Sequence, residues 1–160
     1  THVLKTRDAD AVLTDVCTMR ARIAKEFPSS NPWALKHVRG GMVDIDFIAQ
    51  YLVLQYAHQH PSLWHRAARA VFEQALAEKL LEETPATNLI NAKKFLSDLL
   101  SLLRLSAPGG LITDDAPIGL KRLLVEGMRM ENFDALKASM TAHQAAVIAA
   151  WNAMAAGKLK

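Results

Sequence analysis

The sequence lacks the features that cross-link a small protein or anchor it in a membrane. Cys17 is the only cysteine among 160 residues, so no disulfide can form within the chain. Its neighbours Val16 and Met19 are apolar, which predicts an inert thiol in the core. No apolar run approaches the roughly 20 residues that cross a bilayer, and no signal peptide is visible. We therefore expect a cytoplasmic protein with no membrane partner.

Strong charge of one sign is also missing. The 19 Lys and Arg residues against 16 Asp and Glu give a formal net charge of +3, which is only mildly basic. A dedicated nucleic-acid binder carries a larger basic footprint, so no nucleic-acid partner is expected. The length suits one domain, which we predict over residues 8–157 after a linker tail at 1–7. Because the chain starts at Thr1 in what reads as mid-domain sequence, we expect the C-terminal piece of a longer protein.

Strand patterns are absent as well, because no segment alternates polar with apolar residues or is rich in β-branched residues. Apolar residues recur at the helical period, which predicts an all-α helical bundle of roughly six helices. Residues from about 43 to 60 are apolar nearly all round a helix, so they are expected to form a buried central helix that stops before Pro61. The later helices are expected after Ser62, over 87–106, over 120–128 and from Asn132.

The first helix is read from its cap and its apolar spacing. Asp8 or Asp10 can cap it, Pro28 ends it, and its inward-facing residues are predicted to be Val12, Val16, Met19, Ile23 and Phe27. Arg20 and the other basic residues of this segment are placed on the outer side. Trp33 and Leu35 are expected to anchor the following loop to the core.

Residues 36–54 carry the most distinctive pattern in the chain. A basic loop runs into Gly40-Gly41, two acids follow at positions 44 and 46, and an apolar run comes next. Glycine allows a positive φ or a close backbone approach. A glycine pair where a helix begins predicts free backbone N–H groups that point outward and suit an anion. A plain buried helix with a tight first turn is the simpler interpretation of the same stretch.

Asp44 and Asp46 have the spacing of the Asp-x-Asp pair that binds magnesium in many nucleotidyl transferases. On a strand, residues i and i+2 face the same way, whereas on a helix they diverge by about 200°. The residues after Asp46 are helical in pattern, so the two carboxylates are not expected to close on one ion, and no metal site is predicted. Asp44 is interpreted as an N-cap or first-turn acid. Asp46 and Gln50 share one stripe and are expected to pair or to meet a partner.

Other catalytic patterns are missing. His58, His60 and His65 lie close in sequence, but no Glu-x-x-His or His-Glu-x-x-His frames them, and a solvated corner is the preferred interpretation. The chain has no P-loop, no dinucleotide glycine fingerprint and no Gly-x-Ser-x-Gly elbow. No motif here marks a catalytic residue, so none is assigned, and Ser-His-Asp and Cys-His triads stay open at the level of sequence.

The basic residues Lys36, His37 and Arg39 stand directly before or beside the glycine pair. Such a group suits a phosphate or an acidic partner, because cationic side chains make charge-assisted hydrogen bonds to anionic oxygens. A solvated basic loop is the alternative. The residues alone do not separate the two.

The same stretch resembles the bifunctional glutamine synthetase adenylyltransferase/adenylyl-removing enzyme family. That family carries a Lys-x-x-x-Gly-Gly-x-x-Asp-Ile-Glu-Phe-x-x-Gln motif just after its nucleotidyltransferase domains. Here the motif reads Lys36-x-x-x-Gly40-Gly41-x-x-Asp44-Ile45-Asp46-Phe47-x-x-Gln50. Asp46 stands where the family has Glu, which shortens the reach of that carboxylate. Residues 51–58 are similar to the C-terminal copy of the motif, and segments 19–22 and 102–105 also look like the family.

The resemblance implies a helical domain that follows the adenylylating nucleotidyltransferase domain and closes the polypeptide. The whole enzyme transfers AMP from ATP to a tyrosine of glutamine synthetase, and a second domain removes it by phosphorolysis. ATP and Mg²⁺ are implied for the full-length enzyme, and no cofactor is implied for this fragment. The implied partners are the upstream nucleotidyltransferase domain, glutamine synthetase and the PII signal protein. The loop expected at the domain interface, near the nucleotide, comprises Lys36, Arg39, Gly40, Gly41, Asp44, Asp46 and Gln50.

Two alternatives stay open at the level of sequence. The chain could be a non-catalytic interaction module that binds PII or glutamine synthetase, with the glycine loop needed only for folding. A weaker alternative is the related uridylyltransferase of the PII protein. Residues matching a His-Asp phosphohydrolase site would favour that enzyme, and none is present.

Overall fold

The computed structural model describes residues 8–64, 66–107, 109 and 112–160, and in these residues every regular element is helical. This confirms the predicted all-α helical bundle. In chain order the elements are α1 Ala9–Glu26, α2 Met42–Tyr56, the short 3₁₀ helix η1 Pro61–Leu63, α3 Ala68–Ala77, α4 Glu83–Ser106, α5 Ile118–Gly127 and α6 Phe133–Ala155. None of the described helices is long and apolar enough to span a membrane.

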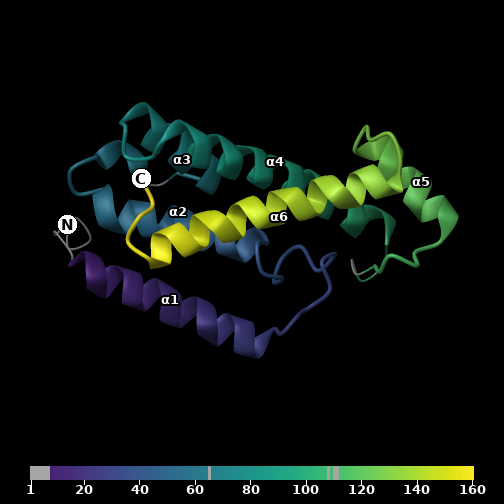
Figure 1. Ribbon diagram of the computed structural model, residues 1–160, viewed down its shortest axis with the longest axis horizontal. Helices are drawn as coiled ribbons and strands as arrows, with labels where there is room; N and C mark the ends of the chain where they lie inside the picture. The colour runs from purple at the N-terminus through teal and green to yellow at the C-terminus, as the bar shows by residue number, and fades with distance from the viewer. Residues whose placement is uncertain (1–7, 65, 108, 110–111) are drawn as a thin grey trace.

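Helix α2 lies at the centre of the bundle, as predicted. It contacts α1, α3, α4 and α6, and its side chains Ile45, Ile48 and Leu52 are fully buried. The long helices α4 and α6 run side by side, α1 lies along one edge, and α5 sits at the end opposite the C-terminus (Figure 1). The head of α2 is therefore enclosed by its neighbours rather than displayed at a free end.

Helix α1 begins as expected but presents a different face to the core. The Asp8 side chain accepts a hydrogen bond from the Asp10 N–H at 3.2 Å, which caps the helix. Met19 was expected inside, but 52% of its surface is exposed, and Phe27 is exposed as well. The buried stripe instead runs through Val12, Val16 and Arg20 at four-residue spacing. The prediction that Met19 faces the core is wrong. The buried position is its neighbour Arg20, and one residue turns a helix by about 100°.

Two helix boundaries near prolines differ from the prediction. Helix α2 ends at Tyr56 rather than near residue 60, and His60 has a non-helical φ of −124°, since the residue before a proline disfavours helical geometry. Helix α4 begins at Glu83 rather than at residue 87. Pro85 is accommodated there because the first turn of a helix needs no N–H donor at that position.

Ser62 does not cap the third helix. It lies in η1, and its hydroxyl donates to the Glu78 carboxylate at the far end of α3. The helix itself starts at Ala68, after an extended Ala67. Between η1 and α3, the side chains of Trp64 and Arg66 line a groove together with residues of α2.

The loop after α1 is held to the core by its aromatic and aliphatic anchors, as predicted. Trp33 and Leu35 are each 1% exposed. The Trp33 ring stacks on Phe133 at a centroid distance of 5.2 Å, and its Nε1–H donates to Asp114 at 2.8 Å. Asn132 caps α6 through a hydrogen bond from the Ala135 N–H, which also confirms the sequence prediction. The loop that carries the glycine pair is thus fixed before it reaches α2.

Candidate functional site

A buried carboxylate organises the head of α2. Asp44 is the third residue of the helix, and its side chain is fully buried. Its Oδ2 accepts hydrogen bonds from Arg39 Nη1 at 2.9 Å and from the Gly40 N–H at 2.7 Å, and its Oδ1 accepts one from Arg20 Nε. The prediction of a first-turn acid is confirmed, because the carboxylate sits at the positive end of the helix dipole and ties back to the preceding loop.

Arg20 is the residue that sequence reasoning missed. It was placed on the outer side of α1, yet its side chain is only 4% exposed and pairs with Asp44. Its Nη2 also donates to the carbonyl oxygen of His37 at 3.2 Å. Its Nη1 is buried and has no acceptor in the described part of the chain. The signal was available, since Arg20 follows Val12 and Val16 at the spacing of one helical face.

The two glycines are required by close packing. Gly40 has a φ of +77°, and a Cβ there would collide with the backbone of Gln144 on α6. A Cβ on Gly41 would collide with the carbonyl oxygen of Leu35. Glycine is the residue that tolerates both a left-handed backbone and such an approach. The simpler interpretation of this loop, a tight start to a buried helix, therefore describes the glycines.

The backbone N–H groups at the head of α2 do not point outward, so the anion-binding prediction for them was wrong. Gly41 N–H donates to the carbonyl of Val38 at 2.9 Å and Met42 N–H to that of Leu35 at 2.8 Å. Val43 N–H donates to the carbonyl of Lys36 at 3.1 Å. The loop thus uses its own carbonyls to cap the helix, and only side chains remain to meet a ligand or partner.

Lys36 and Arg39 reach different surfaces, although the sequence grouped them. The exposed Lys36 lines a hollow of about 360 Å³ with His37 and Arg104. Burial lowers the pKa of His37, and the charges of Lys36 and Arg20 lower it further. Arg39 lines a different hollow, where its guanidinium stands 5.2 Å from the centroid of the Trp151 ring. The basic loop therefore offers two separate cationic positions rather than one.

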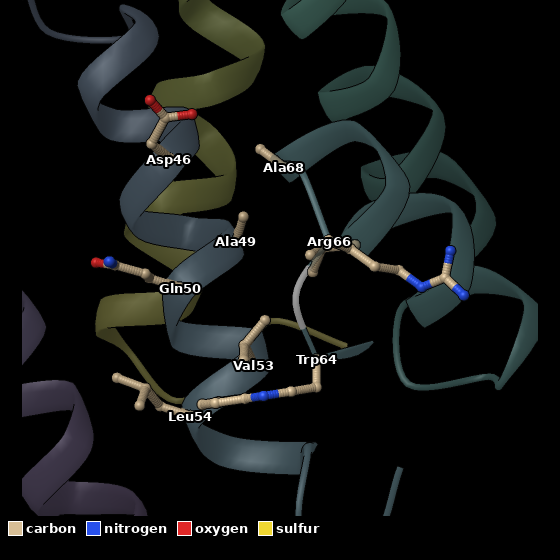
Figure 2. A pocket seen from close by; sticks show the side chains of 9 residues that line it. Asp46, Ala49, Gln50, Val53, Leu54, Trp64, Arg66 and Ala68 are labelled. Atoms are coloured by element: carbon tan, nitrogen blue, oxygen red, sulfur yellow. The ribbon is translucent and has the colours of Figure 1, made fainter. Parts of the chain in front are cut away.

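Asp46 and Gln50 lie on the outer face of α2, four residues apart as predicted. Asp46 is 59% exposed and accepts a hydrogen bond from Lys93 Nζ of α4 at 2.8 Å. Both residues line a groove of about 480 Å³, with Trp64 and Arg66 from the segment before α3 on its other side (Figure 2). Figure 2 shows the Trp64 indole reaching toward Leu54 while the Arg66 side chain points away from α2.

The acids of this chain do not fit a magnesium site. Asp44 is buried between two guanidinium groups, whereas Asp46 faces solvent and Lys93, so the two carboxylates diverge as the helix geometry predicted. Within the described residues no three His, Cys, Asp or Glu side chains converge. The implied ATP and Mg²⁺ concern the full-length enzyme and stay a prediction.

The histidine corner is a structural clamp. His60 and Ser62 both contact the Glu78 carboxylate, and Gln74 Nε2 donates to it at 2.8 Å. These hydrogen bonds, led by that of Ser62, lower the pKa of Glu78 to about 2. His65 lies outside the described residues. The serine and the histidine both bond to the acid rather than to each other, so the three do not form a nucleophilic triad.

Comparison with known proteins identifies relatives but no matching family model. A protein of Rhodopseudomonas palustris strain TIE-1 is 36% identical over 152 residues, or 95% of this chain and 15% of the relative. Proteins of Xanthobacter autotrophicus and a Bradyrhizobium species are 36% and 35% identical over 88% and 92% of the chain. All three are named bifunctional glutamine synthetase adenylyltransferase/adenylyl-removing enzyme. This chain is homologous to one segment of those enzymes.

The resemblance stated from residues 36–58 is confirmed and extends over nearly the whole chain. The chain spans about 15% of the length of these adenylyltransferase/adenylyl-removing relatives, so it corresponds to a part of such an enzyme. The Arg20–Asp44–Arg39 cluster and the packed glycine pair therefore lie in a helical chain that corresponds to one segment of those relatives.

Proposed function

We propose that this chain is the C-terminal helical domain of an enzyme that adenylylates and deadenylylates glutamine synthetase in nitrogen regulation. The names of its relatives and the fraction of them that it spans support this assignment. The observation that carries it is the motif loop itself. Its two glycines and the buried Asp44 hold the loop rigidly at the start of α2, so that the loop presents its side chains. No pair of acids in this loop is available for catalysis.

The role of this domain is then to present Lys36 and Arg39 to the upstream nucleotidyltransferase domain, near its nucleotide. Both side chains are exposed, and both are fixed at their base by a loop anchored through Trp33 and Leu35. The backbone N–H groups of the loop donate hydrogen bonds within the chain, so the cationic side chains are the groups that can contact the upstream domain. Charged donors of this kind suit phosphate oxygens or acidic side chains.

The test is Lys36→Ala in a longer enzyme that contains the upstream domain. Loss of one charge-assisted contact is expected to lower AMP incorporation into glutamine synthetase roughly ten-fold or more. Because Lys36 is exposed, the free energy of unfolding should change by less than about 0.5 kcal/mol. Lys25→Ala is the matched control, since it removes an exposed lysine from the end of α1. Equal activity in the two variants would contradict the interface role.

A second candidate is the interaction module that binds PII or glutamine synthetase. Two large apolar side chains, Leu105 at the end of α4 and Ile118 at the start of α5, are 87% and 76% exposed. Exposed apolar surface of this kind is used in protein contacts. Retention of PII or glutamine synthetase by the immobilised chain, lost on Leu105→Ser, would favour this role over the catalytic-domain contact.

A further inference from the structure

A hollow of about 240 Å³, distinct from the one that Lys36 lines, lies between α1 and α6. It is lined by Cys17, Arg20, Ala21, Ala24, Arg39 and Trp151. The two arginines lie on α1 and in the loop before α2, and both bond to the carboxylate of Asp44. The proposed domain contact uses Arg39, but it assigns no role to Arg20 or to the hollow that the two arginines line.

The charges around the hollow are not balanced. One carboxylate, Asp44, serves two guanidinium groups, and both of its oxygens are already occupied. Arg20 is buried, yet its Nη1 finds no acceptor among the described residues. A buried donor left without a partner costs free energy, so such a group calls for a missing acceptor. Arg39 adds a guanidinium that is 45% exposed and free to meet a ligand with its remaining donors.

The walls of the hollow select the kind of acceptor. Apart from the guanidinium groups the lining consists of alanine methyl groups, a thiol and the Trp151 ring, all weakly polar or apolar. The nearby amides of Gly40 and Gly41 are bonded within the chain and add no donors. A planar guanidinium matches the two oxygens of a carboxylate, and the apolar walls suit a short hydrocarbon stem.

We propose that this hollow, which we call the α1/α6 hollow, binds a carboxylate carried on a short apolar stem. The carboxylate accepts hydrogen bonds from Arg20 and Arg39, and its stem packs against Ala21, Ala24 and Trp151. The carrier is either a free small carboxylic acid or an acidic side chain of a polypeptide. The site shares Arg39 with the proposed domain contact but not Lys36, which lines a different hollow, so a substitution at Ala24 tests the site alone.

The experiment is an NMR titration of the 160-residue chain with two probes, sodium butyrate and the capped peptide acetyl-Ala-Glu-Ala-amide. Sodium chloride at equal ionic strength is the reference. Saturable shifts are expected at the amides of Ala21 and Ala24, at the Trp151 indole N–H and at Arg20 Nε–H. Stronger binding of butyrate supports a free acid as the carrier, and stronger binding of the peptide supports a polypeptide. Equal shifts with chloride, or none with either probe, would overturn the proposal.

Two variants separate charge from shape. Arg39→Gln removes one guanidinium and should weaken binding roughly ten-fold or more. Ala24→Leu fills the hollow from an exposed position on α1, leaves every charge in place, and should abolish the shifts. Arg22→Gln is the matched control, since it removes an exposed arginine of the same helix that does not line the hollow. Two results would contradict the site: binding of the probes that survives Ala24→Leu, or an affinity that Arg22→Gln lowers as much as Arg39→Gln does.

Discussion

The side chain of Asp44 joins its own helix α2 to α1 and to the preceding loop. It accepts hydrogen bonds from Arg20 of α1 and from Arg39 and the Gly40 N–H of the loop. Asp44→Asn removes the charge and leaves the buried Arg20 without a counter-ion. Loss of one partner from a buried ion pair costs about 3–5 kcal/mol, so the free energy of unfolding should fall by that amount. Urea denaturation followed by circular dichroism measures it.

Asp46 is the control for this prediction, since it lies two residues further along the same helix. Its carboxylate is exposed and pairs with Lys93 across the surface between α2 and α4. Asp46→Asn should therefore cost less than about 1 kcal/mol. Similar losses in the two variants would mean that the Asp44 cluster does not hold the head of α2.

Glu78 gives the chain a defined acid sensitivity. Hydrogen bonds from Ser62, Gln74 and His60 hold its pKa at about 2 in the folded state, below the ordinary value of 4.5. A depressed carboxyl pKa adds stability above pH 4.5, and this contribution is lost as the pH falls from 4.5 toward 2. Glu78→Gln should flatten the fall of the thermal midpoint over that window. Glu73→Gln, which removes an exposed acid of the same helix, should leave the slope unchanged.

Sequence reasoning at the scale of residues worked where one helix decides the outcome. The role of Asp44 followed from its place in the first turn, and the divergence of Asp44 and Asp46 followed from helix geometry. The burial of Arg20 was missed because charge was given more weight than spacing. Its partner lies 24 residues away on α2, and that pairing depends on how α1 packs rather than on any local pattern.

At the scale of elements, the start of α2 depends on one point of contact with α6. Gly40 combines a positive φ with close approach to the Gln144 backbone, so Gly40→Ala adds both backbone strain and a collision. The expected loss is at least about 2 kcal/mol in the free energy of unfolding. Gly157→Ala isolates the strain, since Gly157 also has a positive φ, of +67°, but no atom lies near its added Cβ. That variant should lose only about 1 kcal/mol. Equal losses would show that α6 yields to the collision.

The element boundaries show which signals are reliable. Caps with a side-chain acceptor, Asp8 and Asn132, were identified from the sequence and are present. Ser62 looked like a cap but bonds to Glu78, because Pro61 begins a short 3₁₀ helix that includes Ser62 and α3 starts only at Ala68. The glycine pair was recognised as special, yet the Gly40 N–H bonds to the Asp44 carboxylate and the Gly41 N–H to the carbonyl of Val38, acceptors that only the folded loop brings into reach.

At the scale of the whole molecule, the bundle was predictable because its apolar residues repeat at the helical period and α2 is apolar on most of its surface. The hollows were not predictable, since each one is built from side chains of segments distant in sequence. Lys36 shares a hollow with Arg104, and Arg39 shares another with Trp151. A linear motif groups Lys36 with Arg39, whereas packing separates them.

The proposed place of this chain in a longer adenylyltransferase gives the last prediction. The purified 160-residue chain should unfold cooperatively, since α2 is buried among four other helices, but it should not incorporate AMP into glutamine synthetase. The reason is that AMP transfer from a magnesium-bound nucleotide needs converging carboxylates, and the two acids on α2 face opposite ways, with Asp44 neutralised by arginines. Transfer of labelled AMP is measured with the longer enzyme as the positive control. Incorporation by the chain alone at a rate near that of the longer enzyme would place a catalytic centre within these helices and overturn the assignment of an accessory domain.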